Sequence, residues 1–361
     1  MSKVYFTDMR TSFTENLPKK LTRLIDRAGL GTIDFDHKFV AIKIHFGEMG
    51  NLAYLRPQYA RALAAYIKER GGLPFLTDCN TLYVGSRKNA LEHIETAYIN
   101  GYTPYATGCQ VIIADGVRGT DEAYIPIGCE EVKTAKIGRA IADADIIISL
   151  NHFKGHEDAG FGGALKNLGM GSGSRAGKME MHYDGKPVVD RGCLKCATIC
   201  ANDGIHYENN KAVIDHDNCV GCGRCIAICS FDAIKPHNSS SAASLNRRIA
   251  EYAYAVVKDK PNFHISIAAD ISPNCDCHPE NDAPIVPNIG MFASFDPVAI
   301  DLAAADAVNA MPANPRSALS EAECRCHDHF INVHPNTNWR VQIEHGEEIG
   351  LGSSEYELIR I

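Results

Sequence analysis

The chain has 361 residues, with 44 acidic against 36 basic side chains, and so a formal net charge of −8 at pH 7. Hydrophobic residues make up 45% and charged residues 22%, close to ordinary globular usage, which excludes a disordered, collagen-like or coiled-coil protein. The acidic balance argues against a duplex nucleic-acid binder, because contacts to phosphates need a basic face, so small-molecule or protein partners are expected.

Short runs rich in β-branched residues alternate with helical patterns through residues 1–150. The predicted strands are residues 3–7, 39–45, 73–77, 111–115 and 146–150. Between two of them, residues 56–70 have an amphipathic helical pattern that ends at a Gly-Gly pair. This alternation predicts an α/β fold with a parallel sheet covered by helices.

Between residues 187 and 236 a cysteine-rich segment replaces this alternation. A helix at 243–257, a strand at 264–269 and a helix with Asp296 as its N-cap then resume the earlier pattern. We predict an α/β core, residues 1–186 and 238–361, with a bacterial-type, ferredoxin-like iron–sulfur domain inserted at 187–237. Three domains in series are the alternative, but the last ~120 residues would then have few strands for their own sheet.

Fourteen cysteines are unusual for this length, and seven of them lie between Cys193 and Cys229. No apolar run reaches the ~18 residues of a membrane-spanning helix, and the first residues lack the apolar core of a signal peptide. We expect a cytoplasmic protein that binds no membrane. Because a reducing cytosol keeps thiols free, clustered cysteines indicate metal ligation rather than disulfides.

The motif Cys219-x-x-Cys222-x-x-Cys225-x-x-x-Cys229 has the spacing of one half of a bacterial four-iron ferredoxin. Three of its thiolates would hold three corners of one cluster, and the fourth would reach the partner cluster. A structural zinc site is the alternative, but zinc sites usually pair two knuckles across a longer gap.

The cysteine motif is repeated. A shift of 29 residues places Cys193 on Cys222, Cys196 on Cys225 and Cys200 on Cys229. The ferredoxin arrangement then predicts two ligand sets: Cys219, Cys222, Cys225 and Cys200 for one cluster, and Cys193, Cys196, Cys229 and the residue at position 190 for the other.

Position 190 holds an aspartate where the repeat predicts a cysteine. A carboxylate binds iron less firmly than a thiolate, so Asp190 as a ligand would make one corner labile or open to substrate. Alternatively, Asp190 is a loop carboxylate, and this cluster has three irons or uses a distant cysteine. We predict one 4Fe-4S cluster and a second cluster of the 4Fe-4S or 3Fe-4S type.

Two further pairs, Cys275-x-Cys277 and Cys324-x-Cys326, each place two sulfurs close together. Together they could form a four-sulfur zinc or iron site, or lend a ligand to a cluster. They could also be small buried residues without a metal. We keep Cys275 and Cys277 as candidate metal ligands.

The stretch 151–171 is rich in glycine and directly follows the apolar run 146–150. Ligands of open α/β sheets bind at the carboxyl ends of strands, so this is a candidate pocket. Gly160, Gly162, Gly163 and Gly171 would free backbone amides for a phosphate or carboxylate, and Lys166 would add a charge. A close-packed turn without a ligand is the alternative.

Other strand ends carry further candidates. They are Lys43, His45, Glu48, Arg56, Asp78, Asn80, Arg87 and Asp115. Singly, each is more often a satisfied surface or core residue than a catalytic one. His45 and Arg56 are kept as candidate catalytic residues. His156 and His182 are the candidate acid/base residues, because an imidazole titrates near neutral pH.

Several segments resemble the domain-of-unknown-function family 362 with a ferredoxin insert. They are residues 44–48, 76–83 and 152–171, the ferredoxin repeat, Cys275-Asp276-Cys277 and residues 294–301. The resemblance covers nearly the whole chain. It implies an α/β core with iron–sulfur clusters and no settled reaction. The family's first half-site usually has four cysteines, and Asp190 departs from that pattern.

A shorter stretch, His156-x-x-x-Gly160-Phe161-x-Gly163-x-x-Lys166 with a later Gly171 and His182, is similar to the cofactor segment of nickel-dependent lactate racemases. Arg56-Pro57 resembles an Arg-Pro pair of that family. The resemblance implies that His156 would handle the substrate proton, Lys166 would hold a pincer nucleotide, and His182 would bind nickel.

The leading functional prediction is an iron–sulfur oxidoreductase that relays electrons from an external carrier, such as a ferredoxin, to a core pocket for a small anionic substrate. His156, Lys166 and His182 would act there. An isomerase with a nickel pincer-type cofactor is the first alternative, and a non-catalytic, ferredoxin-like electron carrier is the second. An additional metal or nucleotide-type cofactor is left open.

Overall fold

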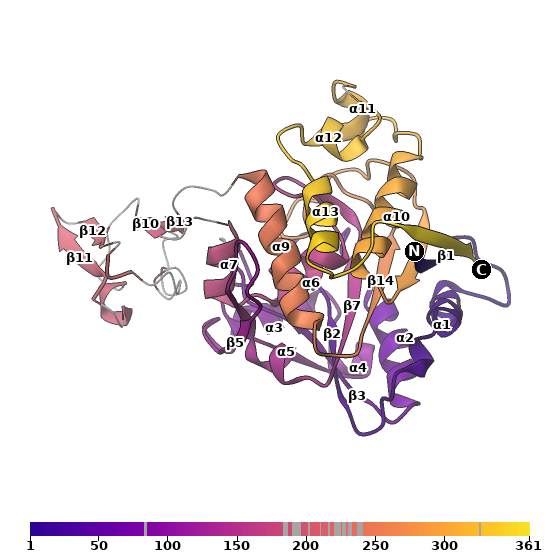
Figure 1. The fold of residues 1–361 in the computed structure, drawn as a ribbon, viewed down its shortest axis with the longest axis horizontal. Helices are drawn as coiled ribbons and strands as arrows, with labels where there is room; N and C mark the ends of the chain where they lie inside the picture. The colour runs from indigo at the N-terminus through magenta and orange to yellow at the C-terminus, as the bar shows by residue number, and fades with distance from the viewer. Residues whose placement is uncertain are drawn as a thin grey trace.

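The structure is a computed structural model of the chain. It describes residues 1–82, 85–182, 187–189, 196–200, 203–209, 211–215, 217–219, 225, 229, 233–236, 241–324 and 326–361. Figure 1 shows a large α/β core, with the short strands of the cysteine-rich segment at one side of it.

An eight-stranded sheet forms the centre of the core, in the order β16-β1-β15-β14-β7-β2-β3-β4. Its strands are β1 (Ser2–Asp8), β2 (Phe39–Lys43), β3 (Leu73–Asp78), β4 (Gln110–Ile113), β7 (Ile146–His152), β14 (Asn262–Ala268), β15 (Gly290–Ser294) and β16 (Tyr356–Arg360). All neighbours run parallel except β15, which is antiparallel to both β1 and β14. The expected α/β fold with a mostly parallel sheet is therefore confirmed.

Helices cover both faces of this sheet (Figure 1). One face packs against α1 (Leu17–Arg27), α2 (Pro57–Lys68), α3 (Ala90–Ile99) and the short α4 (Pro104–Thr107). The other packs against α5 (Arg139–Asp143), α6 (Ala164–Ser172), α9 (Ala242–Val257), α10 (Pro297–Asn309) and α13 (Arg340–Glu348). β7 is buried along its whole length, because Ile147 enters one core and Ile146 and Ile148 enter the other.

The remaining elements are smaller. Two hairpins, β5 (Glu122–Pro126) with β6 (Thr134–Gly138) and β8 (Lys154–His156) with β9 (Gly160–Gly162), lie outside the main sheet. α7 (Arg175–His182) follows α6, while α11 (Ala318–Glu321) and α12 (His329–Val333) precede α13. The part of the chain that the structure describes contains no helix with the length and apolar character of a membrane crossing.

In the cysteine-rich segment, β10 (Pro187–Val189) pairs with β13 (Ile234–Pro236), and β11 (Ile205–Glu208) pairs with β12 (Lys211–Ile214). Both pairs are antiparallel. The main sheet combines strands from before and after this segment, since β14 lies beside β7 and β15 beside β1.

The predicted strands and helices agree with the structure to within a few residues, including the helix capped by Asp296, whose Oδ1 accepts from the amides of Val298 and Ala299. Two strands of the main sheet were missed, as were the strands of the two hairpins outside it. β15 reads Gly-Met-Phe-Ala-Ser, with no β-branched residue, and β16 lies at the end of the chain. Both are recognisable only by pairing with β1, which is distant in sequence.

Candidate functional site

A pocket opens at the carboxyl ends of the central strands, where ligands of open α/β sheets bind. The volume of this pocket, including the open space at its mouth, is about 490 Å³. Its lining residues are Lys43, His45, Asp78, Cys79, Thr81, Arg87, His152, Lys154, Lys166, Asn167, Met170, Gly171, Lys178 and Cys277. They come from the ends of β2, β3 and β7, from α6 and α7, and from the loop after β14.

Positive side chains dominate this lining. The lining includes four lysines and Arg87 but one carboxylate, that of Asp78. Burial would raise the pKa of Asp78, but Lys43, whose Nζ lies 2.9 Å from its Oδ1, outweighs that effect together with His93, His45 and Lys178, and the pKa is lowered. Among the described residues, Nη2 of buried Arg87 has no hydrogen-bond partner. The pocket therefore suits a small anion.

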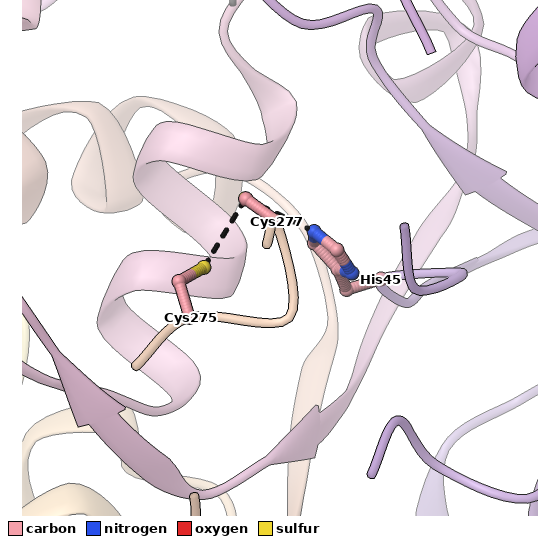
Figure 2. Close-up of side chains that lie close together, drawn as sticks. All are labelled: His45, Cys275 and Cys277. Atoms are coloured by element: carbon pink, nitrogen blue, oxygen red, sulfur yellow. Dashed lines mark hydrogen bonds between the residues drawn. The ribbon is translucent and has the colours of Figure 1, made fainter. Parts of the chain in front are cut away.

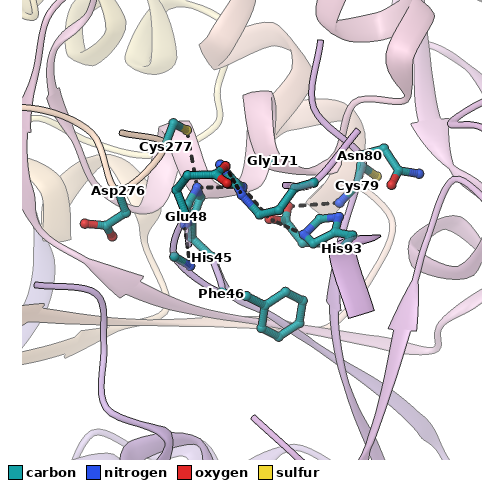
Figure 3. Close-up of polar contacts among 12 residues, drawn as sticks. His45, Phe46, Glu48, Cys79, Asn80, His93, Gly171, Asp276 and Cys277 are labelled. Carbon is teal, nitrogen blue, oxygen red and sulfur yellow. Dashed lines mark hydrogen bonds and ion pairs between the residues drawn. The ribbon is translucent and has the colours of Figure 1, made fainter. Parts of the chain in front are cut away.

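A network of ion pairs holds this charge in place (Figure 3). Arg87 donates from Nε to Oε2 of Glu48 at 3.0 Å, and the amide of Ser86 donates to Oε1 of Glu48 at 2.7 Å. His93 lies behind them, with Nε2 3.8 Å from Oδ2 of Asp78, and burial lowers the pKa of His93 to about 3. Residues that follow β2 and β3, together with His93 of α3, thus form one cluster.

Two thiols lie close together beside His45 (Figure 2), and one of them, that of Cys277, lines the pocket. The Sγ atoms of Cys275 and Cys277 lie 3.1 Å apart, and Nε2 of His45 lies 3.3 Å from Sγ of Cys277. The ligand atoms of these three residues all lie within 4.8 Å of one another and could hold a metal ion. Lys166 donates from Nζ to Sγ of Cys275 at 2.9 Å.

Both ring nitrogens of His45 have donor partners. The amide of Gly47 donates to Nδ1 at 3.0 Å, and Nη1 of Arg87, also a donor, lies 3.0 Å from Nε2. Burial, with the positive charge of Arg87, keeps the pKa of His45 well below its usual value. The sulfur of Cys277 lies 3.3 Å from Nε2 and also takes a hydrogen bond from Arg87.

Cys275 has the environment of a thiolate. A hydrogen bond from Cys277 lowers the pKa of Cys275, and Lys166, Lys154 and a hydrogen bond from His156 lower it further against the effect of burial. Burial would lower the pKa of Lys166, but the sulfurs outweigh it and raise that pKa. One negative charge is thus shared by two sulfurs with donors on both sides.

The loop that carries the two cysteines is fixed on both sides. The amide of Gly155 donates to the carbonyl of Ser272 at 2.9 Å, and the amide of Glu48 donates to the carbonyl of Asp276 at 2.9 Å. The Asp276 carboxylate is fully buried, with Oδ2 2.9 Å from Nδ1 of His152 and 3.8 Å from Nζ of Lys154. A side chain at Gly155 would collide with the Pro273 carbonyl.

The glycine-rich stretch has a different local form from the expected anion loop. Gly160 and Gly162 belong to the β8–β9 hairpin, and Gly163 precedes α6. Asp301 accepts from the amides of Ala164 and Leu165 at 2.6 and 2.8 Å, so these two amides at the start of α6 already have a carboxylate partner. Close packing explains the glycines here.

Each of these glycines is crowded by a side chain. A Cβ at Gly160 would lie 2.8 Å from Cβ of Trp339, and one at Gly162 would lie 3.1 Å from Nζ of Lys154. Side chains at Gly163 and Gly171 would collide with Asp301 and Lys43. Their predicted role in holding a cofactor stays a prediction.

Of the other predicted catalytic residues, His156 and His182 are buried and lie close to each other, whereas Arg56 is exposed. His156 lies beside the thiols, and its Nδ1 accepts from the amides of Asp158 and Ala159 at 3.1 Å each. Buried His182 ends α7, and burial, with His156 and Lys166 nearby, lowers its pKa to about 3. Arg56 is not among the residues that line this pocket; its exposed guanidinium lies 3.5 Å from Asp270.

Sequence reasoning missed His93 and the buried partner of His152, Asp276. No local pattern marks His93, because it lies inside α3 and reaches Asp78 only through the fold. Cys324 and Cys326 are exposed, and within the described residues neither belongs to a group whose ligand atoms could hold a metal. Only the first of the two Cys-x-Cys pairs therefore enters the site.

The predicted cluster ligands are partly visible. Cys193, Cys222 and Asp190 lie outside the described residues. The other cysteines of the repeat belong to or pack against one apolar cluster with Ile205, Ala212, Ile214, Ala233 and Ile234: Cys196, Cys200, Cys219, Cys225 and Cys229.

Backbone amides donate to two of these sulfurs at matching positions. The amide of Gly204 donates to Sγ of Cys200, and that of Ala233 donates to Sγ of Cys229, each at 3.2 Å. The two pairs are 29 residues apart, like the cysteine repeat. Gly204 also packs against Cys219, since a Cβ there would lie 3.3 Å from the Cys219 nitrogen.

Comparison with known proteins identifies one matching family model and several solved structures with distant similarity. The family model described as "Domain of unknown function (DUF362)" matches residues 40–306. No curated protein matches the sequence. The lactate racemase apoprotein from Thermoanaerobacterium thermosaccharolyticum is 11% identical, with a TM-score of 0.42, over 75% of this chain and 51% of that one. A structural-genomics protein from Thermotoga maritima is 12% identical, with a TM-score of 0.39, over 80% and 56%. The chain thus spans about half the length of these proteins.

Proposed function

Since the chain belongs to the DUF362 family, whose description names no activity, we propose its function from its own residues: it is an iron–sulfur oxidoreductase. The cysteine-rich segment passes electrons to the positively charged pocket of the core, where a small anion is reduced or oxidised. An external single-electron carrier, such as a ferredoxin, supplies or removes the electrons.

The paired N–H···S hydrogen bonds at Cys200 and Cys229 carry this proposal. Amide donors to sulfur are one of the means by which proteins tune iron–sulfur clusters. Here they recur with the same 29-residue period as the cysteines, and the sulfurs lie in an apolar cluster. This donor set fits iron better than zinc, because the second half of the repeat offers three closely spaced thiolates, Cys219, Cys222 and Cys225.

The cysteines would be divided between two clusters as the spacing predicts, with Cys200, Cys219 and Cys225 serving one and Cys196 and Cys229 serving the other. Bound clusters would supply single-electron transfer. Gly204, whose amide donates to Cys200, also packs against Cys219, and this contact supports the first of these sets.

The segment also contacts the core beside the pocket. Leu82 and Met179 of the core belong to the same apolar cluster as the cysteines. Their sequence neighbours Thr81 and Lys178 line the pocket. A short path between the sulfurs and the pocket therefore supports electron transfer between them.

Within the pocket, the lysines and Arg87 would hold the anion, and His156 would manage protons. His156 presents Nε2 toward the thiols because backbone amides occupy Nδ1. The low pKa of His182 leaves its ring neutral at pH 7, so it carries no acidic proton to donate and would act as a neutral hydrogen-bonding group.

Iron and acid-labile sulfide measured on protein purified without oxygen test the proposal. Two cubane clusters predict about eight irons per chain, and one cubane with a three-iron cluster about seven. Cys225→Ser should remove about half of the iron, whereas Cys129→Ser, a cysteine outside the repeat, should leave the iron content unchanged. Colourless wild-type protein without sulfide would refute the proposal.

A nickel-dependent isomerase is a second candidate, favoured by one observation. His156, Lys166 and His182 are close enough for both His156 and Lys166 to lower the pKa of His182. Nickel that co-purifies with the protein and is lost in His182→Gln would support this candidate. The contact of Lys166 with Cys275 speaks against it, because that amine is already engaged.

A further inference from the structure

The electron relay proposed above leaves the pair Cys275 and Cys277 without a role. Their Sγ atoms are 3.1 Å apart, and those of a disulfide are about 2.05 Å apart, so about 1 Å of movement would join them. Cys277 lines the pocket, whereas Cys275 is only 1% exposed behind it. The pair therefore has one accessible and one protected sulfur.

We propose that Cys275 and Cys277 form a redox-active dithiol that cycles between two thiols and a disulfide in the wall of the pocket. Cys277, whose sulfur faces the pocket, first passes its proton to the sulfur of Cys275 3.1 Å away and then reacts as the thiolate with an incoming sulfur compound; Cys275 then resolves the mixed disulfide. This inference rests on the geometry of the core alone and does not depend on iron–sulfur clusters in the insert.

The oxidising partner is a small disulfide, RSSR. The sulfur of Cys277 attacks one sulfur of RSSR, one RS⁻ leaves, and a mixed disulfide forms. Cys275 then attacks the sulfur of Cys277, the second RS⁻ leaves, and the internal disulfide closes. The reduced pair holds one proton and one negative charge, so it loses two electrons and one proton, and RSSR takes up these two electrons and this proton to become one thiol and one thiolate.

The donors around the pair support thiol chemistry over metal binding. The amide of Gly47 and the guanidinium of Arg87 each lie 3.0 Å from one ring nitrogen of His45, so neither nitrogen is free to bind a cation. Lys166 and Arg87 place two positive charges beside them. These groups oppose a bound cation and stabilise a thiolate.

The same donors set the expected redox behaviour. Lys166 and the hydrogen bonds on Cys277 stabilise the reduced pair, and a disulfide whose reduced form is stabilised is a stronger oxidant. Removing Lys166 should therefore favour the disulfide.

The test is a redox titration of the full chain, purified without oxygen. The protein is equilibrated with mixtures of oxidised and reduced glutathione, quenched in acid, unfolded and alkylated, and its peptides are weighed. We expect Cys275 and Cys277 to lose two hydrogens together in one two-electron transition. The buried single thiols Cys79 and Cys109 should stay alkylatable in the same samples.

Variants sharpen the test. Cys277→Ser should abolish the loss of two hydrogens. Lys166→Gln should shift the equilibrium with glutathione at least tenfold toward the disulfide, about 30 mV. Lys38→Gln, on an exposed lysine, should leave the equilibrium unchanged. The wild-type titration needs no substitution, so a variant that fails to fold does not decide the outcome.

Two results would overturn the proposal. One is full alkylation of both cysteines in every mixture. The other is a tightly bound metal ion that protects both thiols and is lost in Cys277→Ser. Iron and sulfide are measured on the same samples: if both are absent, the electron relay fails while the result for the dithiol stands.

Discussion

In the core pocket, the sulfurs of Cys275 and Cys277 contact charged side chains, whereas the described sulfurs of the insert contact backbone amides, apolar side chains and, at Cys196, the hydroxyl of Tyr207. Burial raises the pKa of Cys79, which also lines the pocket, and that of Cys109. Burial alone therefore does not determine how a thiol behaves. Cationic neighbours prepare a thiol for chemistry that couples electrons to protons, and amide donors in an apolar setting suit a bound cluster.

The comparison implies that the two regions can be disturbed separately. Changes to the charges or the packing of the core should alter its stability and leave the iron content of each folded chain unchanged. Three substitutions test this, and each should be accompanied by an iron measurement.

The largest effect is expected for Asp276→Asn. It would leave His152 and Lys154 without their buried counter-charge, and breaking a buried pair in this way costs about 3–5 kcal/mol of unfolding free energy. Urea unfolding measures the loss. Asp270→Asn is the matched control, because its exposed pair with Arg56 should contribute only about 0–1 kcal/mol. Equal losses of unfolding free energy in the two variants would show that the buried carboxylate of Asp276 stabilises the fold no more than the exposed pair does.

A pH effect of intermediate size is expected from Asp301, which caps α6 and so fixes the helix of Lys166. Burial raises the pKa of Asp301 to about 7 from 3.8. The folded state then binds this proton more tightly, so stability should fall as the pH rises from 4 to 7, by at most about 1.4 kcal/mol per pH unit.

Asp301→Asn removes that titration, and the difference in unfolding free energy between wild type and variant should change with pH in this window. A constant difference between pH 4 and 7 would show that Asp301 does not titrate there.

The smallest effect is expected for Gly160→Ala. Its φ of +89° disfavours a side chain, and a Cβ would press against Trp339, so a loss of about 1–3 kcal/mol follows. Ala159→Gly, at a buried neighbour, provides a control for local packing changes. Loss of anion binding without loss of stability in Gly160→Ala would instead restore the anion-loop interpretation of this stretch.

Much of the fold could be predicted from the sequence, because β2, β3 and β7 are short, β-branched and bounded by helical patterns. β15 and β16 could not, since their strand character depends on pairing with β1 across most of the chain. Local sequence patterns indicate which residues are apolar. Which distant strands pair with each other depends on the fold of the whole chain.

The candidate site shows the same limit. His45, Lys166, Cys275 and Cys277 could be named from strand ends and spacing, but not that they would meet within a few ångströms. The glycines of 160–163 suggested an anion loop, and their local reason is the bulk of Trp339, Lys154 and Asp301. The sequence indicates that a side chain is not tolerated at these positions, and the structure shows which neighbouring side chains occupy that space.

The clamped backbone around Ser272 and Asp276 has a mechanical consequence. Because main-chain hydrogen bonds hold this loop from two directions, joining or separating the two sulfurs would involve rotation of their side chains and little else. The cavity would keep its outline whichever oxidation level the pair adopts. A bound molecule would therefore sense the change through charge and not through shape.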